Sequence, residues 1–263
     1  MRYDINTEGL SFHHVIDEVP DPSIFQMHTH PKYEIFWFMA GKGTFYIEGT
    51  AYPLHVGDIL IMRSNEAHYL AISPEQPYER CAFHFDPALV RRTGCGAALL
   101  DVFEKRLPGQ NNCFSAADFQ NDDVYGAFLR ICSGGEADKL QALSYLFPLL
   151  FALNTVKREA PPFEEGVVYQ IASYVNRHLE EPLSLEKICK RFFLSKSKLC
   201  RLFKQEMGTT VWQYITVKRL TTARQLINEG KKPAEAAVAV GFSEYSVFWR
   251  AYKKYFSASP KET

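Results

Sequence analysis

The chain has 263 residues, 46% hydrophobic and 23% charged, a composition typical of a soluble globular protein. No apolar run reaches the ~18 residues needed to cross a bilayer, and the polar N-terminus excludes a secretory signal peptide, so a cytoplasmic protein with no membrane partner is expected. The net charge is zero, but residues 1–163 hold 13 Lys and Arg against 20 Asp and Glu, whereas residues 164–263 hold 17 against 10. We therefore expect two units, of which the basic one suits a polyanion.

Residues 1–86 are predicted to form a β-rich domain. Short runs of β-branched and aromatic residues alternate with Gly and Pro, which favour turns. The expected strands are residues 25–39, 43–48, 51–54, 58–62, 69–72 and 78–85. Glu48-Gly49-Thr50 is predicted to be a hairpin turn, because glycine supplies the positive φ that such turns need. Six short strands with polar turns indicate a closed β-barrel or a β-sandwich.

The following segment, residues 87–159, is predicted to be helical. Apolar residues at three- and four-residue spacing predict three helices, over residues 97–106, 122–132 and 136–157. Pro148 predicts a kink or a break in the last of these. Two interpretations stay open: the helices cover the barrel, or the last helix pairs two subunits. Residues 160–163 contain two consecutive prolines and are predicted to be a stiff linker.

Residues 164–263 are predicted to be entirely helical and to contain an internal repeat. The run SLEKICKRFFLSKSKLCRLFKQEMGT is matched, 49 positions later, by PAEAAVAVGFSEYSVFWRAYKKYFSA. Each copy predicts a short helix, a tight turn and a longer helix, capped by Ser195 in the first copy and Ser243 in the second. This is a helix-turn-helix motif present twice, joined by an amphipathic helix over residues 211–229.

The two longer helices, expected over residues 195–206 and 244–255, each leave an outward face with one arginine near its middle. Arginine can pair bidentately with guanine in the major groove, while lysines neutralise phosphates. One basic face is more often a solvated surface, but two matching faces in the basic half favour double-stranded DNA as the partner. The candidate DNA-binding residues are Lys196, Ser197, Lys198, Cys200, Arg201, Lys204, Tyr245, Ser246, Trp249, Arg250 and Lys253. Val247 is expected to face inward.

The run YVNRHLEEPLSLEKICKRFFLSKSKLCRLFKQEMGTTVWQYITVKRLTTARQLI resembles the C-terminal domain of AraC/XylS-type bacterial transcription regulators, and AVGFSEYSVFWRAYKKYFSASP resembles the closing signature of that family. The resemblance implies a sequence-specific regulator of transcription, not an enzyme, that binds promoter DNA as a homodimer and contacts RNA polymerase if it is an activator. By position, seven residues match base-facing residues of the family: Ser197, Cys200 and Arg201 in the first motif, and Tyr245, Ser246, Trp249 and Arg250 in the second. Cys189, Ala236 and Ser257 depart from its pattern.

The same family commonly carries an N-terminal cupin-type barrel, and the stretch MHTHPKYEIFWFMAG complies. The spacing His28-x-His30-x3-Glu34 resembles the first cupin motif, and GDILI followed by His68 resembles the second. Even-numbered residues of a strand share one face, so these side chains are expected to point inward. The expected effector-binding residues are His28, His30, Glu34, Phe36, Phe38 and His68, with Arg80 and His84 as secondary candidates.

The resemblance implies a small-molecule effector, a sugar or related metabolite, and the fold class expected is α+β with two domains. His28, His30, Glu34 and His68 also form a three-His, one-carboxylate set that would accept Zn²⁺, Ni²⁺, Mn²⁺ or Fe²⁺. No cofactor is required for sensing, because such side chains can hydrogen-bond sugar hydroxyls without a metal. The alternative function is a metal-dependent cupin enzyme, or a metal sensor, fused to a DNA-binding domain.

Overall fold

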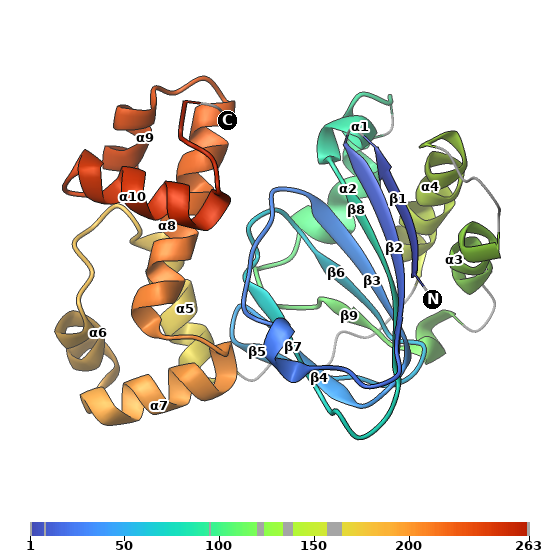
Figure 1. The fold of residues 1–263 in the computed structure, drawn as a ribbon, viewed down its shortest axis with the longest axis horizontal. Helices are drawn as coiled ribbons and strands as arrows, with labels where there is room; N and C mark the ends of the chain where they lie inside the picture. The colour runs from blue at the N-terminus through green and yellow to red at the C-terminus, as the bar shows by residue number, and fades with distance from the viewer. Residues whose placement is uncertain are drawn as a thin grey trace.

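The computed structural model describes residues 2–7, 9–94, 96–119, 124–133, 139–156 and 165–261, which form two domains side by side (Figure 1). The N-terminal domain holds the strands and the blue-to-green helices, and the C-terminal domain holds only helices. The predicted linker, residues 160–163, lies outside the described residues. Among the helices that the structure describes, none is both long and apolar enough to span a membrane.

Two β-sheets form the N-terminal domain. The strands are β1 (Arg2–Thr7), β2 (Leu10–Asp17), β3 (Tyr33–Ala40), β4 (Gly43–Ile47), β5 (Thr50–Pro53), β6 (Ile59–Met62), β7 (His68–Ile72), β8 (Tyr78–Phe85) and β9 (Cys113–Phe114). The larger sheet has the order β1-β2-β8-β3-β6-β9, and the smaller has the order β5-β4-β7. The ladders of the described strands do not close into one ring, so the domain is a cupin-like pair of sheets.

Side-chain alternation along β3 explains why this strand is apolar from Ile35 onward. Phe36 and Phe38 pack into the core between the sheets, whereas Ile35 and Trp37 pack on the opposite face. That opposite face is covered by short or medium helices: α1 (Pro87–Arg91), α2 (Gly96–Glu104), α3 (Val124–Ser133) and α4 (Lys139–Thr155). A strand buried on both faces has no polar side to present to water.

Helix α4 covers the larger sheet with one face and exposes the other. Leu146 and Leu150 are buried, but Leu140 is 74% exposed and Phe151 is 62% exposed. The first interpretation, that this helix covers the sheet, therefore holds for its buried face. The predicted break is wrong, because α4 continues through Pro148. Dimerisation through the exposed face stays a prediction, which sedimentation equilibrium would test.

Three expectations for the N-terminal domain are wrong. The strand expected over residues 25–39 begins only at Tyr33, since the preceding residues form the short 3-10 helix η1 (Pro22–Ile24) and an irregular segment containing Pro31. Strands β1 and β2 were not predicted, although β2 pairs with β8 along its whole length. The segment 87–159 is not purely helical, because β9 extends the larger sheet and η2 (Ala116–Phe119) is a 3-10 helix.

Six helices form the C-terminal domain: α5 (Val167–Arg177), α6 (Leu185–Phe192), α7 (Lys196–Met207), α8 (Val211–Asn228), α9 (Pro233–Ala239) and α10 (Tyr245–Phe256). They surround two separate apolar clusters among the described residues. Ile188, Phe203 and Tyr214 belong to the first, and Leu220 and Phe248 to the second. Helix α8 contributes to both, so it joins two helix-turn-helix motifs, α6–α7 and α9–α10.

Only one of the two predicted helix caps is present. The hydroxyl of Ser195 accepts a hydrogen bond from the Lys198 amide at the start of α7. Helix α10 is capped by Glu244 rather than Ser243, with no side-chain hydrogen bond. The chain leaves α10 through Ser257 in a left-handed conformation, with φ of 55°, where glycine would be unstrained.

Candidate functional site

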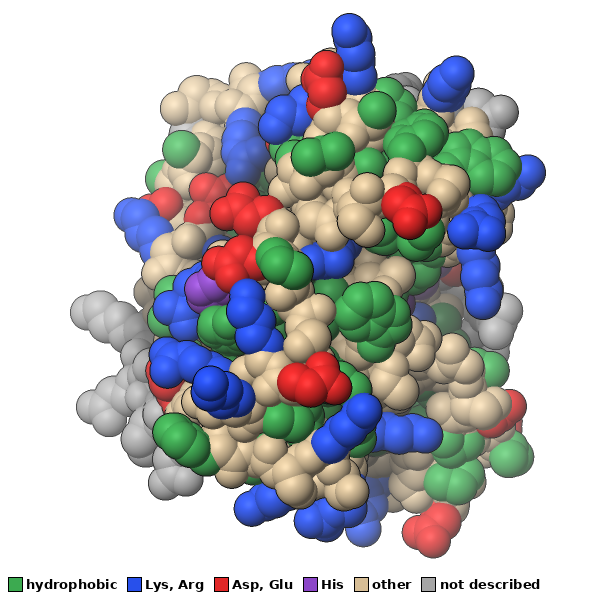
Figure 2. Space-filling model, turned by 90° about the vertical axis from the view of Figure 1, so that its left-hand side faces the viewer, with side chains coloured by type: hydrophobic (Ala, Val, Ile, Leu, Met, Phe, Trp, Pro, Cys, Tyr) green, Lys and Arg blue, Asp and Glu red, His purple; other side chains and the backbone are tan. Residues whose placement is uncertain are grey.

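The outer face of the C-terminal domain carries the candidate DNA-binding residues. All eleven of them, from Lys196 to Lys253, are exposed, and Figure 2 shows basic side chains spread over this face. Leu199 and Phe203 anchor α7 from inside, as Phe248 and Tyr252 anchor α10. This amphipathic arrangement leaves both longer helices with a polar surface free for a partner.

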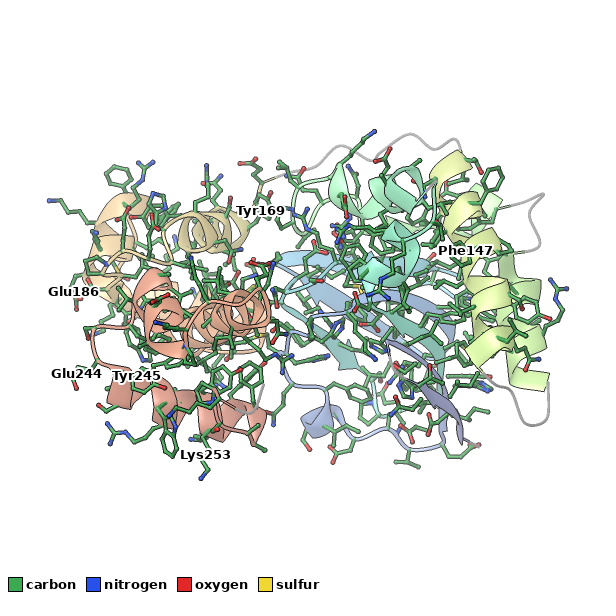
Figure 3. All side chains as sticks on the ribbon, turned by 90° about the horizontal axis from the view of Figure 1, so that it is seen from above. Phe147, Tyr169, Glu186, Glu244, Tyr245 and Lys253 are labelled. Carbon is green, nitrogen blue, oxygen red and sulfur yellow. The ribbon has the colours of Figure 1, made fainter. Side chains whose placement is uncertain are left out.

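Helix α10 lies at the end of the molecule away from the β-sheets (Figure 3), whereas α7 contacts the smaller sheet near its C-terminal end, where the Tyr69 hydroxyl donates to the Gln205 carbonyl. In Figure 3, Tyr245 and Lys253 of α10 lie at the end opposite Phe147 of α4. The ammonium of Lys253 sits 5.2 Å from the ring centre of Trp249, a cation–π contact that orders both side chains. Val247 was expected inward but is 43% exposed, because it lies about 100° around the helix from the buried Phe248.

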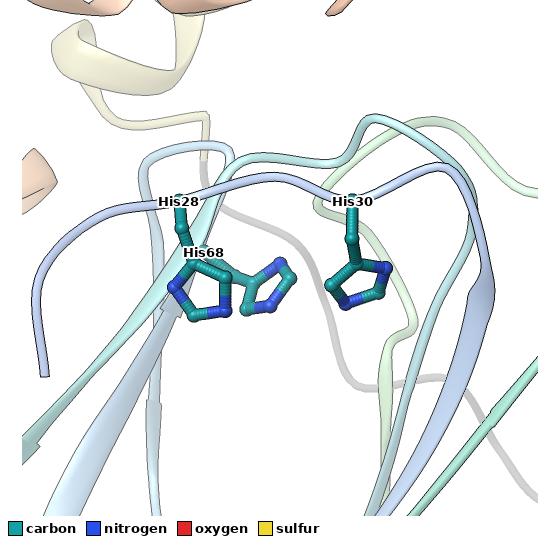
Figure 4. Close-up of side chains that lie close together, drawn as sticks. All are labelled: His28, His30 and His68. Carbon is teal, nitrogen blue, oxygen red and sulfur yellow. The ribbon is translucent and has the colours of Figure 1, made fainter. Parts of the chain in front are cut away.

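A second candidate site lies inside the N-terminal domain. We use the name histidine cluster for His28, His30, Glu34, His68 and His84. The imidazoles of His28, His30 and His68 converge, as Figure 4 shows. His28 and His30 come from the segment before β3, and His68 begins β7, while Glu34 lies on β3 and His84 on the adjacent β8. In two groups, His28–His30–His68 and His30–Glu34–His84, the potential metal-ligating atoms all lie within 4.8 Å of one another.

The carboxylate of Glu34 is the buried centre of this cluster. Its Oε2 lies 2.9 Å from Nε2 of His30 and 3.4 Å from Nε2 of both His68 and His84. Burial alone would raise the pKa of Glu34, but the surrounding imidazoles outweigh burial and hold the pKa well below its ordinary value. Burial tends to lower the pKa of His68, but Glu34 outweighs it and the pKa is raised.

Backbone carbonyls orient three of the imidazoles. Nδ1 of His28 lies 2.9 Å from the carbonyl oxygen of Gln26, and Nδ1 of His30 and of His68 lies 2.8 Å from the carbonyls of Lys32 and Glu66. A carbonyl can only accept, so each Nδ1 must carry the proton. Each Nε2 is then left to accept a hydrogen bond, to take up a proton, or to ligate a metal.

A small cavity of about 90 Å³ adjoins the cluster. It is lined by Phe25, His28, Glu34, Phe36, Phe45, His68, Leu70, Tyr78, Arg80 and His84. Three buried polar atoms here, Nε2 of His68, Nδ1 of His84 and the hydroxyl of Tyr78, have no hydrogen-bond partner among the described residues. Buried polar atoms normally have one, so a polar ligand would complete them.

The structure brings together most, but not all, of the predicted effector residues. His28, Glu34, Phe36 and His68 line the cavity, and His30 contacts Glu34 from outside its lining. Phe38 does not line it, because the side chain is fully buried in the core between the sheets. Tyr78 also lines the cavity but was not predicted, because the pairing of β8 with β3 is a long-range contact that leaves no local pattern in the sequence.

Comparison with known proteins decides what the two domains are. Residues 15–108 match the family described as AraC-like ligand binding domain, and residues 188–263 match the family described as Helix-turn-helix domain. Over 94 residues, the chain is 35% identical to the multiple antibiotic resistance protein MarA of Escherichia coli, covering 35% of this chain and 74% of MarA. The chain belongs to the AraC family of transcription regulators.

Two further relatives of this AraC-family chain are similar over different lengths. The Msm operon regulatory protein of Streptococcus mutans is 24% identical over 267 residues, 99% of this chain and 94% of that protein. The probable transcriptional regulator LumQ of Photobacterium leiognathi is 36% identical over 111 residues, 40% of this chain but only 45% of LumQ. The family consists of DNA-binding regulators, not enzymes, so a catalytic role for the histidine cluster has no support.

The histidine cluster of this AraC-family regulator makes stability depend on pH in a predictable direction. The lowered pKa of Glu34 gives stability that is present above about pH 4.5 and lost as the pH falls through the folded pKa. The raised pKa of His68 gives stability that is present below about pH 6.5 and lost as the pH rises through the folded pKa. The difference in free energy of unfolding between wild type and Glu34→Gln should therefore be largest between about pH 4.5 and pH 6.5.

Chemical denaturation of both proteins at several pH values from about 2.5 to 8.5 checks this, because that range extends about two pH units beyond the window on either side. A stability difference that stays constant across the range would show that Glu34 and His68 are not linked as an ion pair.

Proposed function

We propose that this AraC-family regulator changes its DNA binding when a small polar ligand occupies the cavity at the histidine cluster. The observation that carries the proposal is the convergence of three imidazoles, of His28, His68 and His84, and the buried Glu34 carboxylate on a cavity within the AraC-like ligand-binding domain. Such a concentration of polar groups costs free energy unless a ligand or protons satisfy it. A ligand bound in the cavity would satisfy these groups and so offset the cost of burying them.

The first candidate ligand is a sugar or a related metabolite. Its hydroxyls would donate to Nε2 atoms and to Glu34, and its apolar face would pack on Phe36 or Phe45. The cavity of about 90 Å³ is smaller than most ligand sites, which hold ~300–1,000 Å³. A sugar would therefore require the segment that carries Phe25 and His28 to move outward.

The second candidate ligand is a divalent cation, sensed rather than used in catalysis. It needs far less room, and His28, His30 and His68 present Nε2 atoms in the tautomer that a metal requires. Glu34 would add a carboxylate oxygen and neutralise charge. The donor set thus fits Zn²⁺, Ni²⁺, Mn²⁺ or Fe²⁺.

A thermal-shift screen with sugars and with Zn²⁺, Ni²⁺, Mn²⁺ and Fe²⁺ tests the proposal. A ligand that binds only the folded state stabilises it, and at a hundredfold excess over Kd the melting temperature should rise by about 5 °C or more. His68→Asn should remove most of that rise, because His68 lines the cavity and contacts Glu34.

The exposed Lys231→Met serves as the control variant and should keep the full rise. If His68→Asn also kept the full rise for every compound that stabilises wild type, the ligand would bind elsewhere. If a compound bound through His68 but left DNA affinity unchanged, the cavity would not be a sensor.

We also propose that α7 and α10 place their exposed side chains in successive major grooves of one DNA duplex. Two linked motifs on one chain, whose longer helices both carry an exposed polar face, support this arrangement. Arg201 and Arg250 then read bases, while lysines such as Lys196 and Lys204 contact phosphates.

A further inference from the structure

A buried polar contact joins the two domains at the turn between β4 and β5. Glu48 occupies this turn with a φ of 49°, a conformation that favours glycine or asparagine, yet its carboxylate is only 2% exposed. A strained position with a buried charge is costly in stability, so its partners must compensate. These partners come largely from the DNA-binding domain.

Glu48 is bound by three side chains of the DNA-binding domain. The ammonium of Lys218 donates to Oε1 at 2.8 Å, and the side-chain amide of Asn176 donates to Oε2 at 2.9 Å. The hydroxyl of Tyr214 also donates to Oε2. Lys218 itself is only 7% exposed, so this ion pair is buried. We call these four residues and Asn65 the interdomain latch.

Asn65 connects the latch to both domains. Its carbonyl accepts a hydrogen bond from Lys218 at 2.6 Å, and its side-chain amide donates to Gln225 of α8 at 3.0 Å. Its backbone amide donates to the carbonyl of His30 at 2.9 Å. One residue therefore contacts a member of the histidine cluster on one side and α8 on the other.

Residues 64–69 connect the latch to the cavity. The amide of Ala67 donates to Glu48 Oε1 at 2.7 Å, and Ala67 packs into the first cluster of the DNA-binding domain. The next residue, His68, belongs to the histidine cluster and exchanges two backbone hydrogen bonds with His28. The hydroxyl of Tyr69 then donates to the carbonyl of Gln205 on α7 at 3.2 Å. Neighbouring residues thus face the cavity and the DNA-binding domain.

The latch meets α8 between the two helix-turn-helix cores. Tyr214 belongs to the first core, Leu220 to the second, and Lys218 lies between them. In Figure 1 this helix runs beside the N-terminal domain while α7 and α10 remain uncovered. The latch therefore does not block the DNA-facing surface; it restrains the helix that sets how the two motifs are arranged.

We propose that the interdomain latch holds α8 in an arrangement of reduced DNA affinity, and that ligand binding at the histidine cluster releases it through residues 28–31 and 64–68. This inference rests on the proposed sensing role of that cluster. A pinned α8 limits the adjustment by which both recognition helices fit successive grooves, so only a fraction of the molecules is competent to bind. The release of α8 enlarges that fraction.

The test compares DNA affinity of the full chain by fluorescence anisotropy, with a duplex that the wild-type protein has selected from random sequence. Lys218→Met, Glu48→Gln and the double variant should each bind about fivefold or more tightly than wild type. Lys218→Met is the decisive variant, because loss of a positive charge would by itself weaken DNA binding. Lys231→Met, an exposed lysine of the same domain, should not bind more tightly.

A second measurement needs no effector. Coupling is reciprocal, so the selected duplex should accelerate hydrogen exchange at the Ala67 amide of wild type, whose hydrogen bond to Glu48 reports the latch. If Lys218→Met leaves Glu48 unpaired and the chain does not fold, the double variant, which buries no charge, decides the affinity test.

Affinities within about twofold of wild type for the folded latch variants, or unchanged exchange at Ala67, would overturn the inference. If, in addition, a ligand raised the melting temperature through His68 and also changed DNA affinity, the proposed function would be supported and only the latch would be rejected. Tighter DNA binding by the latch variants, without any His68-dependent ligand, would support the latch and reject the cavity as the sensor.

Discussion

Replacing Arg201 with alanine is expected to weaken binding to a selected DNA site by about 1–3 kcal/mol and to relax base preference at one position. Arg201 is exposed near the middle of α7, anchored from inside by Leu199 and Phe203, so its guanidinium can reach base edges in the major groove. Selection from random sequence followed by anisotropy titration measures both effects. Arg250→Ala on α10 should relax a different position, one groove away.

Two matched variants separate base contacts from charge. Lys198→Ala on the same helix should weaken binding to all sequences and lower the salt dependence by about one phosphate contact. Arg191→Ala removes the same charge as Arg201→Ala from the neighbouring helix α6 and should leave base preference intact. If Arg191→Ala and Arg201→Ala had the same effect on base preference, α7 would not be the recognition helix.

Replacing Arg106 with methionine is expected to lower the free energy of unfolding by about 3–5 kcal/mol. The guanidinium of Arg106 binds both carboxylate oxygens of Glu66, at 2.7 and 2.6 Å, and both side chains are buried. Burial would raise the pKa of Glu66, but Arg106 outweighs burial and the pKa is lowered. Without Arg106 the carboxylate would remain buried with neutral donors only, the backbone amides of Arg63 and Gly109 and, at 3.5 Å, the side-chain amide of Asn112.

Urea denaturation of two further variants tests the cause of that loss. Arg106→Met/Glu66→Leu should be more stable than Arg106→Met alone, because no unpaired charge is buried. Arg91→Met breaks the exposed pair with Glu104 and should cost only about 0–1 kcal/mol. Equal losses for Arg91→Met and Arg106→Met would contradict the explanation by burial.

The histidine cluster could be predicted from spacing, but its geometry could not. The expectation placed His28, His30 and Glu34 on one strand, yet only Glu34 lies on β3. Pro31 interrupts the strand, and the histidines approach instead through the bridge between His28 and His68. The residue types and their spacing therefore identified the site, while hydrogen bonds between segments far apart in sequence decided its shape.

The repeat in the C-terminal domain was predictable because local patterns determine it. Apolar spacing located α7 and α10, and the cap at Ser195 formed as expected. The interdomain latch was beyond such reasoning. Gly49 identified a hairpin turn, but nothing local indicates that Glu48 in that turn binds Lys218, 170 positions away. Contacts between domains leave no periodic signal in the chain.

The outward orientation of α7 and α10 has a consequence for how the molecule meets DNA. The basic half of the chain presents these helices at one end, and the acidic half, with 20 Asp and Glu against 13 Lys and Arg, lies at the other. Near a polyanion, a molecule polarised in this way experiences a torque as well as an attraction. The molecule is therefore oriented with α7 and α10 toward the DNA before any contact forms, and fewer collisions with DNA occur through the acidic domain.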